Sequence, residues 1–291
     1  MLPALPSDLR GMSSARFRSW RWDGNDIVPH RAGVPLSDRG FRYGQHLFES
    51  IAVRNGAALL ASEHLKLLTN SAEEKGIPVS RKMTSALRKF AAGVTVPDGM
   101  LRIYLTAGEG APESPVLTPG LYLTWEPAHF PTGGELKKGI DLTVLKKPFS
   151  GEGWGIKSGN YEAHLTALAS ARAAGAGEGV VLDTKGRVLS CSMGNLLVWL
   201  PGRSGITLVT PPQERGPRQG AVLGWVRRHQ EVVERDLRSA DLQRAAALAV
   251  TNSSLGVMPV ARLNGEKLPG TSLAVDLSQS YLRVHGLLGN A

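Results

Sequence analysis

The spacing of apolar residues along the chain predicts a mixture of helices and strands. Apolar residues recur at helical intervals in four segments, which are 61–76, 80–92, the stretch between Asn160 and Gly175, and 272–286. Shorter apolar or alternating runs predict strands at 47–53, 100–108, 118–126 and 246–250. Residues 178–200 predict three strands, with a turn at 183–186 between the first two and the third strand after Gly194-Asn195. Turn residues separate some of these strands, as at Asn55-Gly56. Both halves of the chain therefore contain helices and strands.

A segment rich in proline and glycine divides the chain into two parts. Residues 126–139 read EPAHFPTGGELKKG, a composition typical of a linker between domains. We therefore predict an N-terminal α/β domain at 1–127, a linker at 128–138 and a C-terminal domain at 139–291. Residues 1–15 contain proline and serine without periodicity, and we expect them to form an N-terminal extension.

Composition and charge argue against several classes of protein. The 291 residues are 42% hydrophobic, which is enough to bury a sizeable core. The longest apolar runs are too short to cross a bilayer, and the first residues lack the apolar core of a signal peptide, so we expect a cytoplasmic protein without a membrane partner. Cys191 is the single cysteine, which rules out an intramolecular disulfide. The net charge of +9 is scattered in short pairs, so we expect no nucleic-acid partner.

Several common site motifs are missing from the sequence. GAGEG at 175–179 follows a predicted helix and precedes a predicted strand, which is the reverse of the dinucleotide-binding order. The seven histidines share no ligand spacing, and we predict no metal site. No GxSxG segment accompanies the serines.

The segment 155–175, GIKSGNYEAHLTALASARAAG, carries the most reactive candidate side chain. Lys157 stands just ahead of the predicted helix, whose start Asn160 can cap. Gly155 and Gly159 bracket the lysine, so the backbone there can approach a ligand closely. A lysine amine in such a place can form an imine with an aldehyde, whereas the spacing alone is equally typical of a solvated loop lysine.

Several segments, in order along residues 20–265, resemble the fold-type IV pyridoxal-phosphate enzymes. This family contains branched-chain aminotransferases, D-amino-acid aminotransferases and aminodeoxychorismate lyases. IKSGNY at 156–161 is similar to the family's lysine motif, and SDRGFRYG at 37–44 is similar to its DRGFLYG motif. TPP at 210–212 resembles a further family segment, and NSSLGVMPV at 252–260 resembles the ending typical of the lyase branch. The resemblance implies a two-domain α+β fold with the site between the domains.

The resemblance also implies the cofactor and roles for particular residues. Lys157 would hold pyridoxal 5′-phosphate and move the α-proton of the substrate. Backbone amides at the start of a helix near Gly220 would take the phosphate. The candidate cofactor-binding residues are Lys157, Tyr161, Ser190, Ala221, Val222, Ser253 and Ser254, and the candidate substrate-binding residues are Tyr43 and Arg102.

Four positions depart from the pattern of the family. Leu67 stands where the phrase HxxRL places a phosphate-binding arginine, and Ala107 stands where TRG places a carboxylate-binding arginine. Arg102 is the nearest arginine to Ala107, although strand alternation puts the two on opposite faces. Ser190 replaces a glutamate that keeps the pyridine nitrogen protonated, and Val222 replaces a threonine. These departures predict loose cofactor binding and slow turnover.

The resemblance leaves three activities open. The short KSGNY spacing and residues 252–260 favour the lyase branch, in which an aminodeoxychorismate-like substrate loses pyruvate to leave 4-aminobenzoate. A D-amino-acid or branched-chain aminotransferase is the second possibility. A degenerate relative with weak or no catalysis is the third. In each case the family implies an amino-acid-like ligand and a homodimer.

Overall fold

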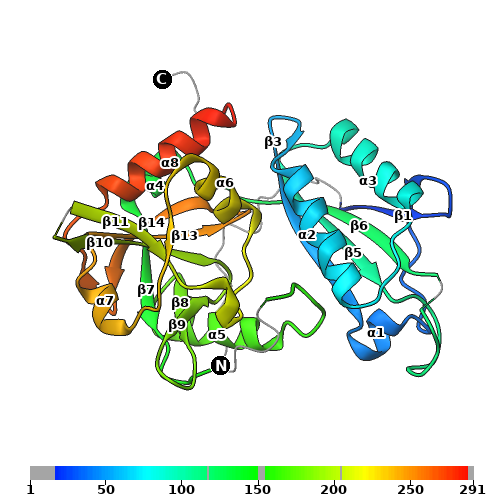
Figure 1. The fold of residues 1–291 in the computed structure, drawn as a ribbon. Coiled ribbons are helices and arrows are strands. Elements are labelled where there is room, and N and C mark those ends of the chain that lie inside the picture. Colours follow the sequence, from blue (N-terminus) through cyan, green and yellow to red (C-terminus); the bar gives the residue numbers. More distant parts are fainter. Residues whose placement is uncertain (1–16, 117, 150–154, 204, 288–291) are drawn as a thin grey trace, which may run out of the picture.

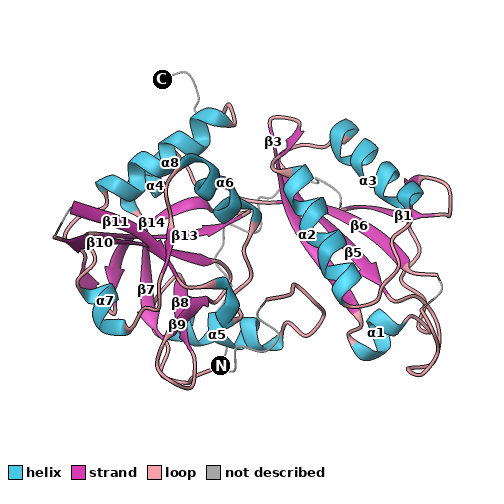
Figure 2. Ribbon diagram, viewed as in Figure 1, coloured by secondary structure: helices cyan, strands magenta, loops and turns pink. Residues whose placement is uncertain are grey.

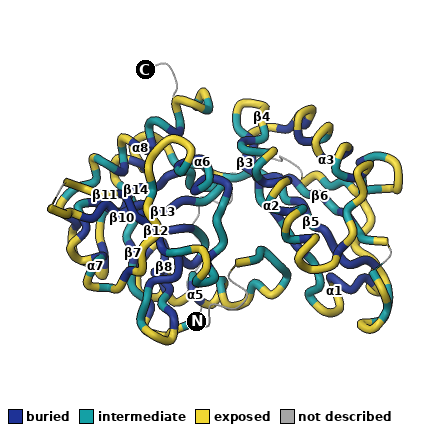
Figure 3. Tube along the Cα trace, in the orientation of Figure 1, coloured by how far each residue is buried: buried dark blue, intermediate teal, exposed yellow. Residues whose placement is uncertain are grey.

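The computed structural model describes residues 17–116, 118–149, 155–203 and 205–287, and it confirms the predicted α+β architecture. The elements form two units, each built around one sheet (Figure 1). Buried residues concentrate along the strands of both sheets, whereas the outer helix faces and the loops are exposed (Figure 3). Within the described ranges, no helix has the length and apolar character that a bilayer span requires.

The N-terminal sheet has six antiparallel strands in the order β2-β1-β6-β5-β3-β4. Asn55 and Gly56 form the turn between β3 and β4, and both have positive φ, of 50° and 75°. Asn-Gly adopts this conformation readily, which explains the tight hairpin. The strands are β1 (Arg18–Trp22), β2 (Ile27–Pro29), β3 (His46–Arg54), β4 (Ala57–Ala58), β5 (Gly99–Thr106) and β6 (Gly120–Pro127).

Three helices accompany this sheet, which are α1 (Arg39–Tyr43), α2 (Ala61–Glu74) and α3 (Arg81–Gly93). Leu65 and Leu68 of α2 and Leu87 of α3 share one buried cluster with strand residues such as Leu101 and Leu123. The helices α2 and α3 therefore pack on the sheet, and α2 runs along it on the side of the second unit (Figure 2).

The C-terminal sheet has nine strands in the order β12-β11-β10-β13-β14-β7-β8-β9, with β15 paired to β14. Its strands are β7 (Ile140–Val144), β8 (Glu178–Leu182), β9 (Val188–Cys191), β10 (Asn195–Gly202), β11 (Gly205–Thr210), β12 (Val233–Glu234), β13 (Ala247–Asn252), β14 (Gly256–Leu263) and β15 (Glu266–Lys267). The turn 183–186 between β8 and β9 falls where the sequence predicts it.

The helices of this unit are α4 (Gly133–Lys138), α5 (Glu162–Ala173), α6 (Ala221–His229), α7 (Ser239–Gln243) and α8 (Ser272–Val284), with a short 3₁₀ turn, η2 (Gln213–Arg215). Trp225 of α6 and Tyr281 of α8 meet edge to face, with ring centroids 5.0 Å apart. Both belong to a buried cluster with Leu197 and Ala249 of the sheet. This packing fixes α6, whose first residues form part of the site.

Two local predictions need comment. The predicted linker 128–138 contains α4, which packs against β14 and α8, while the domain limits themselves stay a prediction. The prediction that Asn160 caps the next helix is wrong. The helix α5 begins at Glu162 with Tyr161 at its N-cap and no side-chain cap hydrogen bond. The Asn160 side-chain oxygen lies beside Gly44 of the N-terminal unit instead.

The segment that carries Lys157 lies along β3, so it joins the two units. Phe48 N donates to Lys157 O at 2.9 Å, and Gly159 N donates to His46 O at 2.9 Å. The approach at Gly159 is close, because a Cβ atom there would lie 2.5 Å from the His46 ring and 2.6 Å from Gly44 O. Any larger residue at 159 would push the lysine segment away from the strand.

Replacing Gly159 with alanine is therefore expected to reduce the free energy of unfolding by about 1–3 kcal/mol, because the added methyl group overpacks this contact. Gly33→Ala is the matched control, since nothing lies within 4 Å of a Cβ atom there. Urea unfolding of both variants measures the difference. Equal stability of the two variants would contradict the described packing of residues 157–159 on β3.

Candidate active site

A cavity of about 370 Å³ lies between the two units and has the size of a typical small-molecule site. The N-terminal unit contributes residues of β3, α2 and β5 to its wall. The C-terminal unit contributes the lysine segment, the connection from β9 to β10, the start of α6 and the turn after β13. The cavity thus brings together residues that are up to about two hundred positions apart in the sequence.

The structure brings eight of the nine predicted site residues to this cavity, namely Arg102, Lys157, Tyr161, Ser190, Ala221, Val222, Ser253 and Ser254. Tyr43 is the one that it does not bring there. That residue lies at the end of α1, is 42% exposed, and has the Arg42 guanidinium 4.9 Å from its ring centroid. The roles of all nine residues stay predictions.

Lys157 lies between two aromatic rings on the cavity wall. Its Nζ atom is 4.8 Å from the centroid of the Phe48 ring and 5.9 Å from that of Tyr161. Burial lowers the pKa of Lys157 to about 8, although the charge of Glu49 acts in the opposite direction. The positive charges of Arg218 and Arg102 reinforce the lowering. At mildly alkaline pH the amine is therefore largely neutral, as a nucleophile or a base must be.

Glu49 is a buried carboxylate that holds side chains from both units. It is 1% exposed, and its two oxygens have different partners. Arg218 donates to Oε1, and His64 Nδ1 lies 2.8 Å from Oε2. Burial alone would raise the pKa of Glu49, but the Arg218 charge and the His64 hydrogen bond outweigh it and lower the pKa. The carboxylate is therefore ionised, and His64 links it onward to Ser253 Oγ at 3.1 Å.

The start of α6 presents backbone donors to the cavity. Gly220 occupies the N-cap without a side-chain cap hydrogen bond, and its own N–H donates to Asn195 Oδ1 at 3.0 Å. The amides of Ala221 and Val222 that follow line the cavity, and helix N-termini favour anions. Thr251 Oγ1 is buried on the same wall and has no hydrogen-bond partner in the described structure. This wall therefore offers hydrogen-bond donors that suit an anionic or polar ligand.

Among the described residues, the cavity wall around Ser190 contains no carboxylic acid. Ser190 Oγ donates to Gly194 O at 2.6 Å, so the hydroxyl proton is already used. The nearby Glu178 carboxyl accepts from Ser192 Oγ and from Met193 N, and it does not line the cavity. Among the residues that the structure describes, Glu49 is the only carboxylate on the cavity wall.

Sequence reasoning missed Glu49, His64 and Arg218 as site residues. For Glu49 a signal was present, because alternation along β3 puts it on the same buried face as Leu47 and Ile51. A charged residue at a core-facing position needs a partner, and that partner indicates a functional contact. No local pattern distinguishes Arg218 from the other arginines of its loop. In the described ranges, no group of three or more His, Cys, Asp or Glu side chains is placed to hold a metal ion.

Comparison with known proteins agrees with this geometry. A family model described as amino-transferase class IV matches residues 46–263. The chain is 27% identical over 276 residues to the bifunctional aminodeoxychorismate lyase / D-amino acid transaminase of Mycobacterium tuberculosis, which covers 87% of this chain and 93% of that protein. It is 26% identical over 254 residues to a protein of Methanocaldococcus jannaschii named as a putative branched-chain-amino-acid aminotransferase. That match covers 84% of this chain and 87% of the relative.

Solved structures show the same fold. The 4-amino-4-deoxychorismate lyase of Pseudomonas aeruginosa superposes with a TM-score of 0.77 at 28% identity, over 93% of this chain and 100% of that one. Because the family model spans well over half of the chain and includes the segment of Lys157, this protein belongs to the class IV aminotransferases, a family of pyridoxal-phosphate-dependent enzymes.

Proposed function

We propose that this enzyme is a lyase that cleaves an aminodeoxychorismate-like substrate into pyruvate and 4-aminobenzoate. The observation that carries the proposal is the position of the turn 252–254, which begins the segment NSSLGVMPV and lines the same cavity as Lys157. Asn252 Oδ1 accepts hydrogen bonds from Ser254 Oγ at 3.0 Å and Leu255 N at 2.8 Å, so the first residue of the segment sets the shape of the turn. The names of two relatives support the same reaction.

The cavity residues fit two groups of pyridoxal phosphate, the phosphate and the aldehyde. The free amides of α6 and the unpartnered Thr251 hydroxyl suit a phosphate group, since both are hydrogen-bond donors. The neutral amine of Lys157 suits the aldehyde group. At the pyridine nitrogen the fit differs from the family pattern, because Ser190 offers no negative charge to hold a proton there.

Bound pyridoxal phosphate supplies an electron sink for negative charge that develops at the amine-bearing carbon of the substrate. The residues of the chain provide the rest. Lys157, once neutral, takes the proton from that carbon and can deliver it again from the same place. The Tyr161 ring flanks the amine, and burial raises the pKa of its hydroxyl to about 12, so Tyr161 stays protonated and able to donate a hydrogen bond.

The proposed cleavage needs no amino acceptor. One C–H bond at the amine-bearing carbon and the C–O bond to the pyruvyl group break, and the departing group gains a proton. The substrate atoms are thereby divided between pyruvate and an aromatic amine. Arg102, which lies on β5 and is paired with Glu126 of β6, is our candidate for the substrate carboxylate.

A D-amino-acid or branched-chain aminotransferase is the second candidate, which the names of the M. tuberculosis and M. jannaschii relatives support. Within the proposal we also place a homodimer in the cytoplasm. Exposed apolar side chains on the N-terminal unit support the dimer, notably Leu36 at 76% and Phe41 at 66% exposed.

The first prediction concerns the pH dependence of Lys157. The rate of pyridoxal-phosphate uptake, followed by absorbance, is expected to rise with pH around a midpoint near 8, because only the neutral amine reacts. Since Glu49 holds the pKa of Lys157 up, Glu49→Gln is expected to move the midpoint lower. Glu266→Gln, an exposed carboxylate on β15, is the control and leaves it unchanged. If the midpoint of the uptake rate lies near pH 10.5 and does not change in Glu49→Gln, the described environment of Lys157 is contradicted.

The second prediction separates the two enzyme candidates. With an aminodeoxychorismate-like substrate, pyruvate and 4-aminobenzoate are expected in equal amounts without any added keto acid. Lys157→Ala is expected to release neither product, because the proton at the amine-bearing carbon then has no base. Strict dependence of product formation on a keto-acid acceptor would assign the protein to the aminotransferases.

The third prediction concerns Ser190. Ser190→Glu is expected to accelerate exchange of the substrate α-proton with solvent, because a carboxylate favours the protonated pyridine and so the electron sink. Each unit of the pyridine pKa corresponds to about 1.4 kcal/mol, or about tenfold in the protonated fraction. Ser190→Ala, which removes the hydroxyl without adding charge, serves as the control. If Ser190→Glu still binds the cofactor but exchanges the proton no faster than Ser190→Ala, residue 190 does not face the pyridine nitrogen.

A further inference from the structure

The helix α2 brings no cation to the cofactor cavity. Leu67 occupies the position where the family pattern has its phosphate-binding arginine, and it does not line the cavity. His64, one turn earlier on α2, does line it and is already engaged with Glu49 and Ser253. A phosphate bound at the α6 amides would therefore lack a charge-assisted contact from this side of the cavity.

The geometry points to Arg218 as the residue that supplies this contact: we propose that Arg218 binds the phosphate of the cofactor from the opposite unit, and that Glu49 is the positioning residue that aims its guanidinium. The proposal concerns the cofactor site of the family and rests on cofactor binding alone. It does not depend on whether the enzyme is a lyase or an aminotransferase.

The position of Arg218 along the chain supports this role. Arg218 lies two residues before Gly220, the N-cap of α6, so the guanidinium and the free helix amides belong to one short segment. Asn195 fixes this segment twice, because its Nδ2 donates to Arg218 O at 2.6 Å and its Oδ1 accepts from Gly220 N at 3.0 Å. Thr251 Oγ1, buried and without a partner in the described structure, lies on the same cavity wall.

The hydrogen bonds of Arg218 leave most of its donors available. A guanidinium carries five N–H groups in a planar fork that matches phosphate oxygens. Within the part of the chain that the structure describes, Glu49 is the only side chain to which Arg218 donates. The Arg218 side chain is 16% exposed and lines the cavity, so its remaining donors are available to a ligand that binds there.

Glu49 directs Arg218 into the cavity and away from solvent. The carboxylate comes from the N-terminal unit, is almost fully buried, and is held from its other side by His64. A buried carboxylate next to a guanidinium is strongly favoured over either charge alone, because each would otherwise be buried without a partner. Arg218 is therefore held in place before any ligand arrives.

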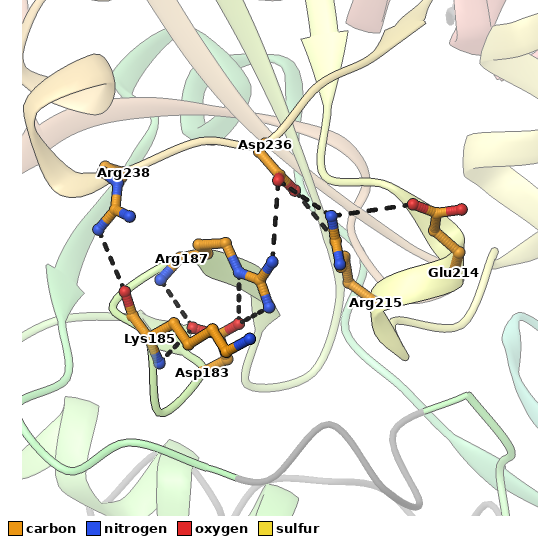
Figure 4. A network of polar contacts seen from close by, with 7 residues as sticks. All are labelled: Asp183, Lys185, Arg187, Glu214, Arg215, Asp236 and Arg238. Carbon is orange, nitrogen blue, oxygen red and sulfur yellow. Dashed lines mark hydrogen bonds and ion pairs between the residues drawn. The ribbon is translucent and has the colours of Figure 1, made fainter.

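An ion-pair network around Asp236 holds Arg215, which lies three residues before Arg218 (Figure 4). Arg215, at the end of η2, makes two contacts of 3.2 Å with the Asp236 carboxylate. Arg187 lies 3.8 Å from Asp236 and 2.6 Å from Asp183, so the network ties the loop to the turn between β8 and β9. The backbone around Arg218 is thus fastened by Arg215 on one side and by Asn195 on the other.

The test compares pyridoxal phosphate with pyridoxal, which lacks the phosphate group. We expect Arg218→Ala to raise the Kd of pyridoxal phosphate about 10- to 100-fold more than it raises the Kd of pyridoxal. Glu49→Gln is expected to raise the ratio of the two Kd values in the same direction but less. That ratio cancels any effect on Lys157, because both ligands carry the aldehyde. Arg244→Ala, which breaks an exposed ion pair on α7, is the matched control and leaves both Kd values unchanged.

A second variant tests the missing charge directly. Adding Leu67→Arg to Arg218→Ala is expected to recover most of the lost affinity for pyridoxal phosphate, because the charge returns from α2. Three results would overturn the proposal. The first is an equal loss of both ligands in Arg218→Ala, and the second is an unchanged Kd of pyridoxal phosphate with a raised KM for the amino substrate. The third is a wild-type protein that binds pyridoxal phosphate no more tightly than pyridoxal.

Discussion

The cavity of this enzyme depends on one buried negative charge. Glu49 lies on the core-facing side of β3, where an unpaired carboxylate would be strongly destabilising. Two contacts stabilise the ionised carboxylate, one with Arg218 from the loop before α6 and one with His64 from α2. The two units must therefore meet at this point in one fixed arrangement. That arrangement places the lysine segment, the start of α6 and the turn 252–254 around one space.

The same charges determine the chemistry that the cavity can perform. The described cavity wall carries three cationic side chains, which are Arg102, Lys157 and Arg218, and one carboxylate, which is Glu49. Burial and the two arginines lower the pKa of the lysine to about 8, and Glu49 limits the lowering. An excess of positive charge in a partly enclosed space attracts anions, such as a phosphate group and a substrate carboxylate. The cavity thus offers a reactive amine and the charges that would hold an anionic ligand beside it.

Much of the fold could be predicted from the sequence, because periodicity and turn residues report on local structure. The hairpin at Asn55-Gly56 and the helices α2, α3 and α8 follow directly from such signals. The α5 N-cap was predicted wrongly, since Asn160 lies against Gly44, a neighbour that is distant in the sequence. Local patterns contain no information about contacts of that kind.

Site residues that belong to a sequence motif could be predicted. Site residues whose role arises from a contact with a residue distant in the sequence could not. Lys157, Ser253 and the α6 amides stand in recognisable motifs, and the structure brings them together. The pairing of Arg218 with Glu49 spans 169 positions, so neither residue is marked as a partner of the other in the sequence. The loss of the arginine at position 67 is visible in the sequence, whereas the cation on the opposite wall is visible only in the fold.

The central claim is that Lys157 is the residue that attaches pyridoxal phosphate in this cavity. The most direct measurement is the visible absorption spectrum of the protein with the cofactor, recorded before and after borohydride and followed by peptide mapping. The account predicts a new absorption band that borohydride removes, and a stable label on the peptide that contains Lys157, which is absent in Lys157→Ala. A label on the exposed Lys66 or Lys185, or no label on any lysine, would contradict it.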